Sequence, residues 1–111
     1  MSDIQQLEQD IASAEELVVR RQMAIKLFGN REFKKLFTEE YFVSEAARLV
    51  QLSADPSLDA AQRADALNMA QATGHAKRYL SMVVQMGAHA ERDLPEAHRT
   101  LDEMRAIEGE E

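Results

Sequence analysis

The chain contains no cysteine and no tryptophan, and it has only two prolines and four glycines among 111 residues. The absence of cysteine excludes a disulfide scaffold, a thiolate metal site and a cysteine nucleophile, and it suits a cytosolic or virion protein. Aromatic residues are also scarce, with four phenylalanines and two tyrosines. A chain of this length predicts one domain, residues 1–111, with a modest core that partner chains would help to stabilise.

Long hydrophobic runs are missing as well. No apolar run approaches the roughly 18 residues that a membrane span requires. Met1-Ser2-Asp3 leads directly into an acidic helical pattern instead of a signal peptide. We therefore expect a cytoplasmic protein that has no membrane partner.

What the chain does contain is an apolar repeat with a period of seven residues. Its a and d positions are Ala66, Met69, Thr73, Ala76, Leu80, Val83, Gly87, Ala90, Leu94, Ala97, Leu101 and Met104. Alternating spacings of three and four residues place these side chains on one face of a helix, where a second helix can pack. The pattern predicts a long helix over residues 59–107.

A second repeat of the same period occupies the N-terminal region. Its apolar positions are Ile4, Leu7, Ile11, Ala14, Val18, Ile25 and Phe28. Arg21 interrupts this repeat, so either its stem reaches out of the helix contact or it marks where the helix leaves its partner. The two repeats predict an all-α fold in which an N-terminal helix, residues 1–28, packs antiparallel to the long helix. Middle helices over residues 31–54 would close one end.

Capping residues set the predicted helix boundaries. Ser2 with Gln5, and Asp59 with Gln62, have the spacing of a capping box, which begins a helix. Gly29 is placed to follow the end of the first helix.

Further breaks divide the rest of the chain. Asn30 is placed to begin the next helix, and Thr38 could begin another, although one bent middle helix is equally compatible with the pattern. Proline disfavours helix in the residue before it, so Asp55-Pro56 ends the middle segment. Pro95 is expected to kink or end the long helix.

The three histidines do not form a metal-binding pattern. No glutamate stands three residues before His75, His89 or His98, as carboxylate-bridged metal bundles require. His89 with Asp93, and His98 with Asp102, supply only two ligands each. Since the chain also lacks a glycine-rich phosphate loop and an activated serine, we expect no metal, no cofactor and no enzymatic activity.

Charge is distributed unevenly along this acidic chain, whose net charge is −7. Between residues 20 and 35 there is one acid and six basic residues, so the segment carries +5; the basic residues are Arg20, Arg21, Lys26, Arg31, Lys34 and Lys35. Such a basic band is a candidate contact for nucleic acid or for an acidic protein. Pairing with acidic residues of the long helix is the simpler interpretation.

Two further features of the long helix indicate contacts with other chains. Met82 and Met86 lie off the heptad face, which predicts a second apolar face that an oligomer could cover. Gly87 and Ala90 are small residues at successive positions of the heptad face, where a second backbone can approach closely. Either the N-terminal helix or a partner chain could fill that space.

Four segments of the chain carry a resemblance to a known group of proteins. They are Glu32–Phe37, Tyr41-Phe42, Glu45–Val50 and Tyr79–Gly87. About half of the chain resembles small helical proteins encoded by tailed bacteriophages. The resemblance implies a virion-assembly or virion-structural role, in the host cytoplasm or the virion, or a phage factor that acts on a host protein.

These observations predict a non-enzymatic assembly or adaptor protein, homo-oligomeric or part of a larger assembly, that acts through protein–protein contacts. Two alternatives remain open. One is a packaging or regulatory factor that binds nucleic acid through the basic band. The other is an acidic phage inhibitor of a host protein.

Overall fold

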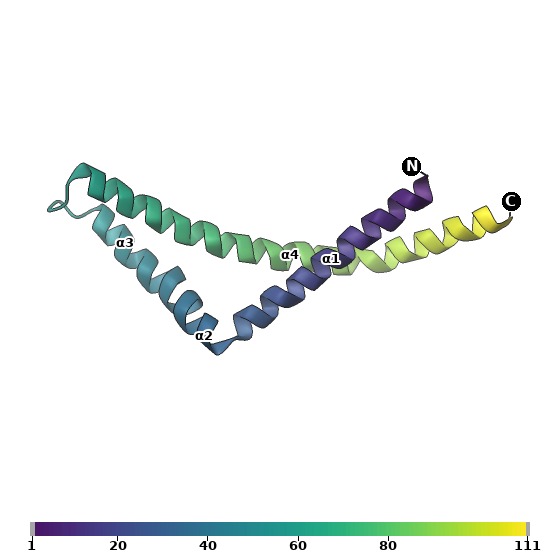
Figure 1. The fold of residues 1–111 in the computed structure, drawn as a ribbon, viewed down its shortest axis with the longest axis horizontal. Helices are drawn as coiled ribbons and strands as arrows, with labels where there is room; N and C mark the ends of the chain where they lie inside the picture. Colours follow the sequence, from purple (N-terminus) through teal and green to yellow (C-terminus); the bar gives the residue numbers. More distant parts are fainter. Residues whose placement is uncertain (1, 111) are drawn as a thin grey trace. The chain divides into compact units, whose positions relative to one another are not determined.

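The computed structural model describes residues 2–110, and the side chains of residues 2–109. Every element in this range is helical, and the elements are α1 (Asp3–Gly29), α2 (Arg31–Phe33), the π-helix η1 (Lys34–Glu45), α3 (Ala46–Ser53) and α4 (Ala60–Glu110) (Figure 1). No strand occurs within these described residues. The predicted all-α fold is therefore confirmed.

The helices gather in two compact units. One unit consists of Met1–Ala24 and Val83–Glu111, and the other of Ile25–Met82. Most of α1 thus shares a unit with the C-terminal half of α4, while the middle helices share the other unit with the N-terminal part of α4. The sequence predicts one domain by length, and the structure shows that its contacts form these two groups.

Three ion pairs between α1 and α4 show the direction in which these helices pack within the first unit. Glu8 pairs with Arg105 at 3.8 Å, Glu15 with His98 at 3.7 Å and Arg21 with Glu91 at 3.4 Å. Residue numbers rise along α1 as they fall along α4, so the two helices are antiparallel within this unit. The partners on α4 are spaced by seven residues, which is the spacing of charges that flank a heptad face. The predicted antiparallel pairing of the N-terminal helix is confirmed.

The predicted heptad face of α4 is the side of the helix that is shielded from solvent. Of its twelve predicted positions, only Met69 is exposed, and Ala66, Thr73, Gly87, Ala90 and Leu101 are buried. Thr73 is the one polar residue among them, and its hydroxyl donates a hydrogen bond to the carbonyl of Ala70 at 2.7 Å. This bond explains how a polar side chain is tolerated there.

Of the positions predicted for the repeat in α1, Ile25 is the one that is exposed; those from Ile4 to Val18 are covered, and Phe28 is half-buried. Ile25 was predicted to continue it, but Ile25 is 45% exposed, whereas Ala24 is 5% exposed. A straight helix has 3.6 residues per turn, so a strict seven-residue repeat drifts by about 20° each time it recurs. Three recurrences amount to about 60°, whereas Ile25 and Ala24 lie about 100° apart around a helix, so this drift alone does not account for the shift of the covered face to Arg21 and Ala24.

The middle segment is helical without interruption from Arg31 to Ser53, and η1 is its unusual part. Two contacts within η1 join residues five apart: Lys35 pairs with Glu40 at 3.3 Å, and the Ser44 hydroxyl donates to the Glu39 carbonyl at 3.3 Å. A π-helix brings residues i and i+5 together, whereas an α-helix does not. The choice between one middle helix and two is resolved in favour of one.

Three expectations based on α-helical spacing are wrong in the middle segment. Thr38 was a candidate helix start, but it lies inside η1 and its hydroxyl has no hydrogen-bond partner among the described residues. An α-helical period also predicts Leu36 on one side with Phe33 and predicts Val50 facing inward. Both are more than half exposed; Leu36 lies inside η1, where the wider turn changes which residues share a face.

The helix starts predicted at Ser2, Asn30 and Asp59 are confirmed. In both capping boxes the bonds are reciprocal: Gln5 N–H donates to Ser2 Oγ and Gln62 N–H to Asp59 Oδ1, and each glutamine side chain accepts from the backbone of its partner. Asn30 accepts from the Phe33 N–H at 2.8 Å. Gly29, however, is the last residue of α1 and has no positive φ, so it does not form the expected left-handed cap.

Two other predicted breaks have different outcomes. The chain leaves helix at Ala54, and Asp55 holds the turn by accepting bonds from the Ser57 backbone and hydroxyl, which keep the pKa of Asp55 below its ordinary value. Pro95, in contrast, does not end α4, which continues to Glu110. The proline removes one backbone donor, but Leu94 and Ala97 beside it are half-buried and hold the helix in its contact.

Replacing Asp59 with alanine should destabilise the protein by about 0.5–2 kcal/mol, because the Gln62 N–H loses its acceptor at the start of α4. Urea unfolding followed by far-ultraviolet circular dichroism measures this change. Asp59→Asn is the matched control, since asparagine caps as well as aspartate and should cost only a few tenths of a kcal/mol. Equal losses in both variants would show that the charge of Asp59, and not its cap, matters.

Candidate partner-contact surfaces

Gly87 is covered by α1 of the same chain. A Cβ atom built on Gly87 would lie 2.2 Å from Cβ of Arg21 and 2.6 Å from the carbonyl oxygen of Leu17. The close approach that the sequence predicts is therefore present, and the N-terminal helix makes it. Ala90, one turn further on, is buried. Neither residue is offered to a partner in this structure, although both were candidates for such a contact.

Arg21 lies across this close approach. Its stem contacts the position of Gly87 and its guanidinium reaches Glu91, so the side chain extends out of the helix contact, which is one of the two roles expected for it. The pair also agrees with the simpler interpretation of the basic band, in which its cations neutralise acids of the long helix. Arg21 is thus occupied within the first unit.

The remaining cations of the basic band differ in their surroundings. Arg20 is half-buried on α1 in the first unit. The other four are exposed in the second unit: Lys26, Arg31, Lys34 and Lys35. Arg31 and Lys35 line one hollow of the surface together with Glu32 and Leu36. Lys35 pairs with Glu40, whereas no acid of residues 2–109 lies within ion-pair distance of Lys26, Arg31 or Lys34.

Met82 and Met86 are exposed on α4, each at 44%. Tyr79, which precedes Met82 by three residues, is exposed as well. Residues at spacings of three and four lie on one side of a helix, so the second apolar face predicted for α4 exists and is accessible.

Five of the six aromatic side chains form one cluster, which sequence reasoning did not find. Phe33 stacks on Phe37 with ring centroids 5.0 Å apart, and Phe28 meets the edge of Phe33 at 5.8 Å. Tyr41 and Phe42 extend the cluster along η1. Their spacings of four and five residues were the available signal, and they fit the wide turn of a π-helix better than an α-helix.

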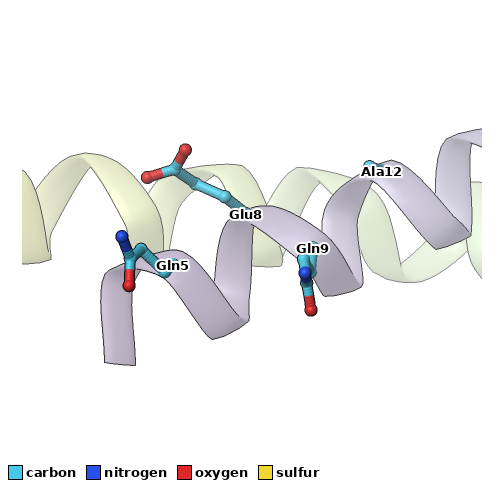
Figure 2. Close-up of a pocket in the computed structure, with 4 residues that line it drawn as sticks. All are labelled: Gln5, Glu8, Gln9 and Ala12. Carbon is cyan, nitrogen blue, oxygen red and sulfur yellow. The ribbon is translucent and has the colours of Figure 1, made fainter. Parts of the chain in front are cut away.

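Three surface hollows among residues 2–109 are each lined by a single stretch of helix. One is lined by Gln5, Glu8, Gln9 and Ala12, all on α1, and Figure 2 shows that their side chains spread apart without converging on a point. The hollow at Arg31 and another on α4 are likewise lined by one short stretch of chain each. A single helix face cannot surround a small molecule, so these hollows are shallow features of helix surfaces.

His89 and His98 were considered as metal ligands together with Asp93 and Asp102, but each histidine has a different partner. His98 pairs with Glu15 of α1, and His89 contacts the guanidinium of Arg92. Within residues 2–109, no three histidine or acidic side chains are placed to hold one metal ion.

None of the helices that the structure describes is long and apolar enough to cross a bilayer. The candidate surfaces are thus the exposed cations of the second unit, the exposed apolar side chains and the covered contact at Gly87. No family model, curated protein or solved structure was found to match this chain.

Proposed function

We propose that this chain is a non-enzymatic helical assembly or adaptor protein that acts through protein–protein contacts. The observation that carries the proposal is the exposure of large apolar side chains on ordered helices. Among the described residues, the buried apolar ones are Ile11, Ala24, Leu49, Ala66, Ala90 and Leu101, and half of these are alanines. Larger side chains such as Met23, Leu36 and Val43 lie outside this core. A contiguous exposed apolar surface marks a site where another protein binds, and we propose that some of these side chains form one.

The setting we propose is the virion or the virion-assembly pathway of a tailed bacteriophage. The resemblance of residues 32–37 and 79–87 to small helical phage proteins supports this setting. Mass spectrometry of purified particles and of assembly intermediates tests it. Recovery of the chain in fixed stoichiometry supports the proposal, and its absence from both would reject a virion-related role.

Replacing Leu36 and Val43 together with serine should abolish or weaken association while changing the free energy of unfolding little, within about 0.5 kcal/mol for each exposed position. The reason is that both side chains are exposed in the single chain and would become buried only in a complex. Sedimentation velocity measures the mass, and thermal unfolding at low concentration confirms the fold.

Gln71→Ser, at an exposed polar position of α4, is the control and should leave the mass unchanged. If the double variant associates as the parent chain does, these apolar residues do not form the contact.

A nucleic-acid-binding packaging or regulatory factor is the competing proposal, and the exposed cations Lys26, Arg31 and Lys34 favour it. Retention on duplex DNA should then fall as salt rises, because bound phosphates release counterions. Since Arg21 is tied to Glu91, Lys34→Gln with Lys35→Gln is the informative substitution. Loss of retention in that variant would favour nucleic acid over a protein partner.

A further inference from the structure

Antiparallel packing of α1 on α4 brings two acidic segments, far apart in the sequence, to the same end of the first unit. The Glu8–Arg105 pair places the beginning of α1 beside the end of α4. Residues 2–10 and 102–109 then contribute six acids and one base, a net charge of −5; the acids are Asp3, Glu8, Asp10, Asp102, Glu103 and Glu108. All six are exposed. We refer to these two segments together as the acidic tip.

A basic surface lies in the second unit. Residues 25–37 contain four cations and one acid, a net charge of +3, and the cations Lys26, Arg31, Lys34 and Lys35 are all exposed. Leu36 and Phe37 lie among them, 58% and 42% exposed. The acidic tip has a corresponding apolar residue, Ile107, which is 61% exposed. Each surface therefore combines charge of one sign with accessible apolar area.

We propose that the basic surface of one copy binds the acidic tip of a second copy. This inference rests on the proposed function and names the partner for it. The opposite charges attract, and Ile107 would be removed from water against Leu36 and Phe37. A contact that joins two different surfaces of identical chains is heterologous, so it repeats from copy to copy until a ring closes or a filament grows.

The geometry of the basic surface favours a protein partner over nucleic acid. A base would need a free aromatic face, but Phe37 is already stacked on Phe33 with an interplanar angle of 13°, and Tyr41 meets its edge. Glu32 and Glu40 place carboxylates among the cations, and Lys35 is paired with Glu40 at 3.3 Å. Phosphates would be repelled by these carboxylates, whereas a mixed protein surface can match them.

Sedimentation velocity over a range of protein concentrations, with the full chain, tests the inference. Association should be strong at low salt and lost near 1 M salt, where the Debye length falls to about 3 Å. Lys34→Glu with Lys35→Glu should weaken self-association about tenfold or more, since it places like charges opposite one another. Lys77→Glu with Arg78→Glu changes the same charge at exposed positions of α4 and should have no such effect.

A mixing experiment distinguishes the specific contact from general electrostatic attraction. Asp102→Lys with Glu103→Lys reverses the acidic tip, and this variant alone should fail to associate. Mixed with the Lys34→Glu, Lys35→Glu variant, it should restore association, because each reversed surface then meets its complement. All substituted positions are exposed, and circular dichroism confirms that each variant is helical.

Several results would overturn the inference. The first is a single-copy mass at every protein concentration in low salt. The second is a loss of self-association in the Lys77→Glu, Arg78→Glu control equal to that in the Lys34→Glu, Lys35→Glu variant. The third is that mixing the two reversed variants does not restore association. Loss of DNA retention with unchanged mass in the Lys34, Lys35 variant would also overturn it and assign the cations to nucleic acid. If association persists in high salt and depends on Leu36 and Val43 alone, the head-to-tail contact is wrong while the proposed assembly function stands.

Discussion

Replacing Gly87 with alanine is expected to destabilise the protein by about 1–3 kcal/mol, although the same change in an open helix is stabilising. The new methyl group would lie 2.2 Å from Cβ of Arg21 and 2.6 Å from the carbonyl oxygen of Leu17. One of these atoms is in the backbone of α1 and the other is the first side-chain carbon of an α1 residue. Neither can rotate away, so the overlap is relieved only if the two helices move apart. Their ion pairs and buried face would be strained by that movement. Gly87→Leu should cost at least as much.

Gly74 provides the matched control, because nothing lies within 4 Å of a Cβ atom built on it. Gly74→Ala should therefore stabilise α4 by roughly 0.5–1 kcal/mol through helix propensity alone. Urea unfolding of both variants measures the change in the free energy of unfolding, which should have opposite signs in the two. If Gly87→Ala also stabilises, α1 does not approach α4 as closely as the structure shows, and the glycine is merely tolerated there.

Leu49→Ala should also lower the free energy of unfolding strongly, by about 2–5 kcal/mol. Leu49 is 3% exposed and is the one large apolar side chain of α3 that is buried. Its truncation removes apolar atoms from contact and leaves a cavity that the surrounding helices can only partly close. The loss should appear as a lower midpoint in urea and a lower melting temperature.

The neighbouring residue Val50 serves as the control, since it is 52% exposed on the same helix. Val50→Ala should change the free energy of unfolding by no more than about 0.5 kcal/mol. Similar losses in the two variants would mean that α3 is packed through a different face. A small loss in both would mean that α3 contributes little to the second unit.

The helical repeats and helix ends could be predicted because they depend on local rules. The face of α4 from Ala66 to Met104 follows from a spacing of three and four residues, and eleven of its twelve positions are covered. The capping boxes at Ser2 and Asp59 formed because each needs only residues three apart. Such features are decided within one or two turns of chain, where distant contacts have little influence.

The covered face of α1 beyond Val18 and the middle segment could not be predicted in the same way. Ala24 is buried and Ile25 is exposed, and the seven-residue repeat holds no signal for this exchange, because it depends on what α1 packs against there. In η1, the pairs Lys35–Glu40 and Ser44–Glu39 are visible in the sequence as residues five apart, but an α-helical period places them on different faces. In the aromatic cluster, the pairs Phe28–Phe33 and Phe37–Phe42 are likewise five residues apart, whereas Phe33–Phe37 has the ordinary spacing of four.

The sequence alone determined that this chain is helical, where most of its helices begin, and which side of α4 is covered, because those properties arise from neighbouring residues. Only the tertiary structure decided that α1, and not another copy, covers Gly87, since the sequence shows that space is needed but not what enters it. It also decided that the acidic segments 2–10 and 102–109 lie at the same end of the first unit. Their separation along the chain is long, and antiparallel packing alone brings them together.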